Sequence, residues 1–325
     1  MWTDGILGQT LAKGLLGSAL KQDRLAQSYL FYGPEGVGKA HVAKRLAMAV
    51  QCDTGFGIGC GSCAACTKLL RDTHPDFHMI YPEGNNIRID QVRALQGIMS
   101  RRPHQGRRRI AVFDPADKLN EPAANALLKL LEEPPEDSLL ILISENSAKL
   151  LPTIRSRCMP LRFSALSQQE LKSALPQGLA EPMRHLTLAA ARGSLGELLR
   201  LCSQSDWLED RQNNIAWYLE EPGWGMWERL KFAEEREAQW RERSNWQNFL
   251  QNWQALSRDR LMLALGVSDG LLNNPDFAKE LKGMPTVDKI ELQKRITGLG
   301  EALQQLAAYT TPRLIVESVL LSWMA

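Results

Sequence analysis

The segment YLFYGPEGVGKA, residues 29–40, decides how the rest of the chain is interpreted, because an apolar run passes directly into a glycine-rich loop. Residues 33–40 fit the phosphate-binding pattern G-x-x-x-x-G-K-[ST] at every position except the last. The glycines let backbone N–H groups converge on an anion, and the lysine adds a positive charge at the start of a helix. These candidate phosphate-binding residues are Gly33, Gly36, Gly38 and Lys39. The order of strand, loop and helix predicts a nucleotide-binding ancestry.

The last position of the loop lacks an atom that the pattern requires. A Ser or Thr there supplies a hydroxyl ligand to Mg²⁺, whereas Ala40 supplies none. Glu35 also places a carboxylate where the charge of a phosphate would lie. The sequence therefore predicts an altered site and leaves open whether the loop still binds a nucleotide such as ATP.

A second part of the expected nucleotide site is altered in a similar way. In proteins with such a loop, an apolar strand ends on an Asp that holds Mg²⁺, normally followed by a Glu that positions the attacking water. Here the apolar run 109–113 leads to Asp114, Pro115 takes the place of the Glu, and Asp117 lies too far along to replace it. Asp114 could instead be an ordinary helix or turn cap. With two positions vacant, we expect hydrolysis to be lost.

Apolar runs and amphipathic segments alternate through the first half of the chain. The expected strands lie near residues 29–32, 77–81, 109–113, 139–143 and 159–163, with helices between them. This alternation predicts a parallel sheet covered by helices on both faces. We therefore expect an α/β domain over residues 1–164.

The rest of the chain is expected to be wholly helical. Residues 167–170 form the capping-box pattern S-x-x-E near the start of a small helical unit over residues 165–205. Residues 206–325 are expected to form a third, all-helical domain, which carries eight of the nine tryptophans. These tryptophans either pack in the core of that domain or anchor a subunit interface.

The overall charge gives no protein-wide attraction for nucleic acid or membrane. The 325 residues include 39 basic and 37 acidic side chains, a formal net charge of +2. The first residues lack the pattern of a signal peptide, and no apolar run reaches the roughly 18 residues needed to cross a bilayer. We therefore expect a soluble, cytoplasmic protein without membrane contact.

One local patch is basic. Residues 101–109 contain five arginines and one histidine in a loop that leads into an apolar strand. Such a run is either simply solvated or in contact with a phosphate backbone or an acidic partner. The sequence leaves these alternatives open.

Four of the six cysteines cluster in residues 52–66 with the spacing C-x7-C-x2-C-x2-C. Four thiolates on two close C-x2-C steps can hold one tetrahedral zinc ion. An iron–sulfur cluster is the alternative for this spacing, and unliganded thiols are a third possibility. With zinc, all four ligand positions would be filled, so the expected role is folding and not catalysis. The expected ligands are Cys52, Cys60, Cys63 and Cys66.

Arg157 follows a short segment, residues 150–156, that precedes the last expected strand. An arginine at the edge of a domain can stabilise the γ-phosphate of a nucleotide on a neighbouring subunit. From the spacing alone, a surface arginine in an ordinary ion pair is the more economical interpretation.

Taken together, these residues resemble the clamp-loader subunits of bacterial DNA polymerase III, a family of AAA+ proteins. The segments that carry the resemblance are Gly33–Lys39, the four-cysteine insertion, His74–Asp76, Asn125–Pro135 and Leu150–Cys158. The resemblance is strong over about residues 1–165 and weaker in the tryptophan-rich end.

The resemblance implies a RecA-like AAA+ core with a zinc module, a small helical lid, and a C-terminal helical collar domain that holds subunits in a ring. It also implies a task. With motor (gamma/tau) subunits and a delta subunit, such a protein opens the sliding clamp and places it on primed DNA. In that hetero-oligomer, Arg157 would act in trans as an arginine finger on the ATP of the adjacent motor subunit. The chain would belong to a DNA-directed DNA polymerase holoenzyme, a nucleotidyltransferase, without ATPase activity of its own.

Three departures from the motor-subunit pattern favour a non-hydrolysing subunit. Ala40 and Pro115 are two of them, and Gly196 stands where motor subunits carry an arginine that senses the γ-phosphate. A self-sufficient P-loop ATPase motor is the competing hypothesis. A zinc-dependent DNA-binding protein with a vestigial loop is a third.

Overall fold

The structure is a computed structural model that describes residues 2–176, 179, 181–203, 207–308 and 310–324. The chain divides into two compact units. The first comprises Met1–Gln177 and Ala191–Arg200, and the second comprises Gly178–Ala190 and Leu201–Ala325.

The first unit combines helices with strands. Its elements in chain order are α1 (Thr10–Lys21), β1 (Ser28–Tyr32), α2 (Lys39–Gln51), α3 (Ala64–Leu70), β2 (Phe77–Ile80), α4 (Ile89–Met99), β3 (Arg109–Phe113), the 3-10 helix η1 (Ala116–Lys118), α5 (Glu121–Glu132), β4 (Ser138–Ser144), η2 (Ser147–Lys149), α6 (Pro152–Arg155), β5 (Met159–Arg162) and α7 (Gln168–Lys172). Helix α9 (Leu195–Ser203) begins in this unit.

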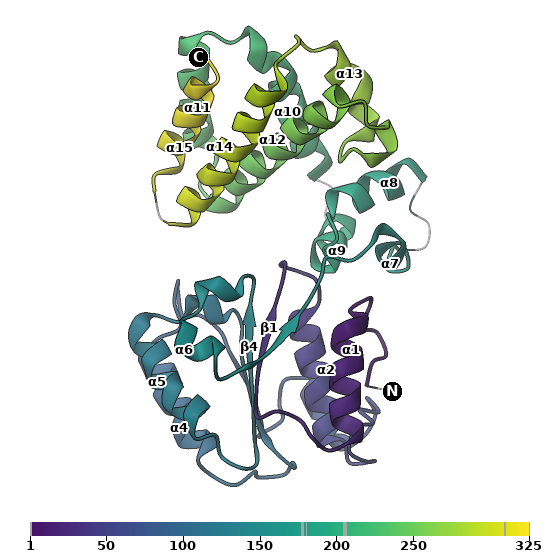
Figure 1. Ribbon diagram of the computed structural model, residues 1–325, viewed down its shortest axis with the longest axis vertical. Helices are drawn as coiled ribbons and strands as arrows, with labels where there is room; N and C mark the ends of the chain where they lie inside the picture. Colours follow the sequence, from purple (N-terminus) through teal and green to yellow (C-terminus); the bar gives the residue numbers. More distant parts are fainter. Residues whose placement is uncertain (1, 177–178, 180, 204–206, 309, 325) are drawn as a thin grey trace. The chain divides into compact units, whose positions relative to one another are not determined.

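The strands described in this unit form one parallel sheet in the order β2-β3-β4-β1-β5. In β1, Tyr29 and Phe31 pack on one face and Leu30 on the other, as the two-residue repeat of a strand requires. Helices α1 and α2 cover the first face, and α4, α5 and α6 cover the second (Figure 1). Each face has its own apolar core, so the expected parallel sheet covered on both sides is confirmed.

The carboxyl ends of the parallel strands meet at one edge of the sheet, where ligands bind in open sheets of this kind. The turn after β1 leads through residues 33–38 into α2, and β3 ends directly before Asp114. The backbone N–H of Gly33 donates to Ser144 O at the end of β4. The fold therefore brings the glycine-rich loop and Asp114 to the same edge, as the sequence predicts.

The second unit contains only helices among its described residues. These are α8 (Glu181–Ala190), the end of α9, α10 (Trp207–Glu220), η3 (Glu221–Gly223), α11 (Met226–Gln239), α12 (Arg243–Ala264), η4 (Asp269–Leu271), η5 (Pro275–Phe277), α13 (Ala278–Gly283), α14 (Lys289–Ala307) and α15 (Pro312–Ser322). The helical character expected after residue 164 is confirmed.

The core of the second unit is rich in tryptophan. Trp246, Trp253 and Trp323 are buried in it, and the rings of Trp253 and Trp323 stack with their centroids 5.5 Å apart. Core packing, one of the two interpretations of these side chains, is therefore confirmed for most of them. Trp227 differs, because 71% of its side chain is exposed.

The division into three domains stays a prediction. Its boundary at residues 205–206 lies outside the described residues.

No helix that the structure describes is long and apolar enough to cross a membrane.

Candidate functional site

The loop between β1 and α2 depends on its glycines. Gly33, Gly36 and Gly38 have φ angles of 146°, 69° and 97°, a region that side chains disfavour. A Cβ on Gly33 would collide with the carbonyl oxygen of Phe163, and one on Gly36 would collide with Ser194 Oγ. The path of the loop therefore requires the glycines that define the sequence motif.

Lys39 directs its ammonium group onto the loop itself. Its Nζ donates to Gly33 O and to Pro34 O, at 2.6 Å in each case. The side chain is buried, and burial lowers the pKa of Lys39. The negative charges of Glu145 and Asp114 act to raise this pKa, but the effect of burial is larger. The lysine that would neutralise a phosphate is thus satisfied by two carbonyl groups of the loop.

Carboxylates occupy the mouth of the loop. Burial raises the pKa of Glu35, and the negative charge of Glu145 raises it further. Burial also raises the pKa of Asp114, while the charge of Lys39 opposes that shift. An incoming polyphosphate would meet negative charge here, which disfavours its binding.

The described part of the structure shows no replacement for the groups that are missing at Pro115 and Ala40. The carboxylate of Asp117 accepts a hydrogen bond from Ser144 Oγ at 2.5 Å and one from the Glu145 N–H at 3.1 Å, so it is not a free substitute for the residue missing at Pro115. Ala40 packs its methyl group against the apolar core beneath α1 and α2.

The beginning of α9 lies directly against the loop. The backbone N–H of Gly196 donates to Gly36 O at 2.9 Å, and a Cβ on Gly196 would lie only 3.2 Å from Gly36 Cα. Ser194 Oγ accepts from the N–H of Glu197 at 3.1 Å and so holds the first turn of α9 in place. The family resemblance predicted that Gly196 stands in the place of a sensor arginine, but the sequence gave no signal of this contact.

The four cysteines expected to bind metal lie together. Their Sγ atoms are all within 4.8 Å of one another, and those of Cys52 and Cys63 are 3.9 Å apart. Tetrahedral bonding at the usual zinc–sulfur distance places sulfurs roughly 3.8 Å apart. The set Cys52, Cys60, Cys63 and Cys66 therefore fits a single four-coordinate ion without an open position.

Backbone N–H groups point at three of these sulfurs. The N–H of Cys60 donates to Cys52 Sγ, that of Cys63 to Cys60 Sγ, and that of Cys66 to Cys63 Sγ, at 3.3–3.5 Å. Hydrogen bonds, first from the Ser62 backbone, lower the pKa of Cys60 to about 5, whereas burial raises the pKa of Cys66. The bonds to sulfur favour the thiolate, which is the form that binds metal.

The cysteine insertion is built onto α2 and the N-terminal segment. Cys66 is fully buried, with its Sγ 3.8 Å from Met48 O in α2. A Cβ on Gly59 would lie 3.2 Å from Trp2 Cβ, and Arg45 Nε donates to Trp2 O at 2.8 Å. The module thus braces the helix that follows the phosphate-binding loop.

Arg157 lies just after α6, with its guanidinium at the surface. Nη2 forms an ion pair with Glu132 Oε1 at 2.6 Å, and Nη1 donates to Thr153 O at 2.9 Å. The two charged side chains are 34% and 48% exposed. An ion pair this exposed contributes about 0–1 kcal/mol, so Arg157 can exchange Glu132 for another anion at small cost. The sequence did not indicate that Glu132 holds this arginine.

Asp76 organises the basic loop that joins α4 to β3. Its carboxylate is fully buried and accepts hydrogen bonds from the backbone N–H groups of His104, Gln105 and Gly106 at 2.7–2.8 Å. Arg109 Nη1 lies 3.6 Å from Asp76 Oδ1. In the sequence, His74–Asp76 only contributed to a family resemblance. Its partners lie 28–30 residues further on, so no local pattern could reveal this role.

Comparison with known proteins finds similarity over the first half of the chain. Residues 8–167 match the family described as "DNA polymerase III, delta subunit". The chain is 44% identical over 176 residues to the DNA polymerase III subunit delta' of Pseudomonas aeruginosa, which covers 52% of this chain and 53% of that protein. It is 34% identical over 204 residues to subunit delta' of Bacillus subtilis, which covers 63% of this chain and 62% of that protein.

The chain also resembles a subunit with a different name. It is 32% identical over 208 residues to DNA polymerase III subunit tau of Escherichia coli, covering 62% of this chain and 32% of that protein. The matches thus span less than two thirds of the length of each of these relatives.

Proposed function

We propose that the protein is a non-hydrolysing subunit of a clamp loader, because residues 8–167 match the family described as "DNA polymerase III, delta subunit" and the chain is similar to proteins named delta'. It would assemble in the cytoplasm with motor (gamma/tau) subunits and a delta subunit, open the sliding clamp and load it onto primed DNA. The similarity to proteins named delta' and tau supports this assignment. The assembly would serve a DNA-directed DNA polymerase.

The observation that carries this proposal is that polar groups of the phosphate-binding loop are already hydrogen-bonded within the protein. Lys39 Nζ is bonded to two carbonyl oxygens of the loop, and Gly36 O accepts the N–H of Gly196. Phosphoryl transfer needs a metal ligand and a group that positions the attacking water, and Ala40 and Pro115 supply neither. The chain would therefore contribute a rigid wall to the assembly and no turnover of its own.

Arg157 would supply the catalytic contribution in trans. A guanidinium offers a planar, permanently charged fork to a phosphate. That of Arg157 lies at the surface and is held by the exposed ion pair with Glu132. On a neighbouring motor subunit, it would stabilise the charge that develops on the γ-phosphate.

The ion held by the four cysteines would be zinc. When bound, zinc supplies a fixed tetrahedral cross-link within residues 52–66 and no reactive position. An iron–sulfur cluster spreads its thiolate ligands over several irons and needs them farther apart than a single ion does.

The proposal also includes a helical lid over residues 165–205 and a ring-forming collar over residues 206–325.

The proposal is tested by ATP turnover with and without partners. The isolated chain should hydrolyse no ATP, whether or not primed DNA is present. Mixed with motor and delta subunits, it should stimulate DNA-dependent turnover, and Arg157→Ala should remove most of that stimulation. Arg155→Ala is the matched control, because Arg155 is also exposed and lies on the same segment. Unchanged turnover and clamp loading with Arg157→Ala would refute the arginine-finger role.

One competing function has an observation in its favour. The similarity to tau over 62% of the chain is what a self-sufficient motor subunit would also show. Robust DNA-stimulated ATP hydrolysis by the isolated chain would establish that function and overturn the proposal.

A further inference from the structure

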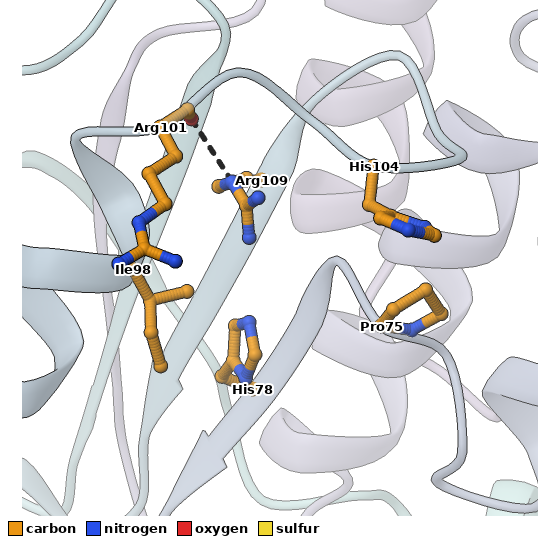
Figure 2. Close-up of a pocket in the computed structure, with 6 residues that line it drawn as sticks. All are labelled: Pro75, His78, Ile98, Arg101, His104 and Arg109. Atoms are coloured by element: carbon orange, nitrogen blue, oxygen red, sulfur yellow. Dashed lines mark hydrogen bonds between the residues drawn. The ribbon is translucent and has the colours of Figure 1, made fainter.

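A cavity lies at the edge of the sheet opposite the phosphate-binding loop, near the amino ends of β2 and β3. It has a volume of about 250 Å³ and is lined by Pro75, His78, Ile98, Arg101, His104 and Arg109 (Figure 2). The volume corresponds to roughly eight water molecules. Four of the six lining side chains are basic or imidazole groups, and the other two are apolar. The cavity therefore combines the charges of two guanidinium groups with two apolar side chains.

His78 has a ring nitrogen without an assigned task. Its Nε2 atom is buried and has no hydrogen-bond partner among the residues that the structure describes. Buried polar atoms are nearly always paired, so an orphan of this kind calls for a ligand or a water. Burial, then the charge of Arg109, lowers the pKa of His78. The ring is therefore neutral near pH 7 and can donate one hydrogen bond.

Arg109 keeps donor capacity toward the cavity. Its Nε and Nη2 donate to the carbonyl oxygens of Arg101 and Arg102, which holds the guanidinium in place. Its Nη1 lies 3.6 Å from Asp76 Oδ1, farther than a hydrogen bond. Asp76 is already occupied by three backbone N–H groups. A strong acceptor in the cavity would complete the hydrogen bonding of Nη1.

Arg101 supplies a second guanidinium. Its side chain is exposed, and no ion pair or hydrogen bond of that side chain occurs within the described residues. Figure 2 shows the nitrogen-bearing ends of Arg101, Arg109 and His78 directed toward the same space. Two guanidinium groups repel cations, which excludes a metal ion. They match the geometry of a tetrahedral oxyanion.

We propose that this cavity is a binding site for a phosphate group, held by Arg101, Arg109 and His78. A phosphate presents three oxygens to three converging donors, whereas a carboxylate can satisfy only two. The site is separate from the degenerate nucleotide loop and does not depend on the function proposed above. It also gives the basic loop 101–109 a specific task instead of general solvation.

The test uses the full chain with isotope-labelled histidine, because five histidines give a spectrum that single substitutions can assign. Inorganic phosphate replaces chloride at constant ionic strength. The ring signals of His78 should shift saturably, while those of His41 and His185, which do not line the cavity, should not. If His78 stays unchanged until all five histidines shift together, the site does not exist.

Two neighbouring arginines provide the matched variants. Arg101→Ala should weaken phosphate binding about tenfold or more, because a charge-assisted hydrogen-bonded contact is lost. Arg102→Ala removes a neighbouring exposed charge that does not line the cavity, and should change the affinity less than twofold. Equal effects of the two variants would mean general charge attraction and would overturn the proposal. Equal binding of acetate would overturn the assignment to phosphate.

The source of the phosphate is distinguished by competition. If a single-stranded oligonucleotide shifts the His78 signals and displaces inorganic phosphate, the group belongs to a nucleic-acid backbone. If phosphate binds and the oligonucleotide does not compete, the source is a free phosphate or a small phosphate ester. Both results support the site and differ only in what carries the phosphate.

Discussion

Replacing Asp76 by Asn tests whether one buried carboxylate holds the basic loop in place. The substitution keeps the size of the side chain and removes its charge. It leaves one carbonyl oxygen for the three N–H groups of His104, Gln105 and Gly106 and points an NH₂ group at donors. It also leaves the buried guanidinium of Arg109 without its counter-ion.

The expected loss is large for a single isosteric change. Hydrogen bonds to a charged group contribute about 1.5–3 kcal/mol each, and breaking a buried pair by removing one partner costs about 3–5 kcal/mol. The bonds are not independent, so we expect about 3–5 kcal/mol in total. That is a large fraction of the stability of a typical domain, about 5–15 kcal/mol.

The stability lost on Asp76→Asn should depend on pH and become smaller in acid. Burial acts to raise the pKa of Asp76, but the N–H groups of His104, Gln105 and Gly106 and the charge of Arg109 outweigh it, so the pKa is lowered. A lowered pKa contributes stability that is fully present above the unfolded value, about 4, and is lost as the pH falls through the folded value. The gap between wild type and Asp76→Asn should therefore be constant near pH 7 and shrink below about pH 4.

Urea unfolding at several pH values measures the effect, followed through the ring signals of His74, His78 and His104, all of which belong to the first unit. Asp72→Asn is the control, because Asp72 forms a 2.8 Å ion pair with Lys44 but is 61% exposed; it should cost less than about 1 kcal/mol. Similar losses for the two variants, or a gap that persists at low pH, would refute the reasoning.

Three further outcomes are expected. Cys63→Ser should lower the metal content from about one zinc per chain to near zero and lower the melting temperature, because folding of residues 52–66 is linked to the ion. Metal analysis and calorimetry measure these changes, and full zinc content in the variant would contradict the prediction. Ala40→Ser should restore no ATP hydrolysis by the isolated chain, because Pro115 still provides no group to position water; measurable turnover would contradict this. Glu132→Gln should change the stimulation of ATP turnover by the motor subunits by no more than about fivefold, since an exposed ion pair with Arg157 is worth at most about 1 kcal/mol. A larger effect in the reconstituted ATPase assay would show that Glu132 does more than hold the arginine.

Much of the fold could be predicted because its signals are local. The apolar run 139–143 is buried on both faces of the sheet, and it lies within β4. The order of strand, glycine loop and helix at residues 29–51 is found as expected. The capping box at Ser167 is present, with Glu170 N–H donating to Ser167 Oγ. The close placement of the four cysteines also followed from their spacing.

The remaining features depend on contacts between distant parts of the chain. The motif predicts that Lys39 lies at the mouth of the loop, but not that its ammonium group bonds to Gly33 O and Pro34 O. Glu132 meets Arg157 across 25 positions of sequence. The cavity beside the basic loop is lined by residues between positions 75 and 109, which the folding of that loop brings together. A periodicity or a motif carries no information about such pairings, because they are decided by packing.

The hydrogen bond between Gly196 and Gly36 bears on how the degenerate site could evolve. A side chain can return at position 196 only if this segment moves away from the loop, since a Cβ there would crowd Gly36 Cα at 3.2 Å. A hydroxyl regained at position 40 would bring no advantage while Lys39 stays on its carbonyl partners and Pro115 remains. Each reversal alone is neutral or harmful, and only several together would restore an ATPase. The contact therefore makes the loss of the site difficult to reverse by single substitutions.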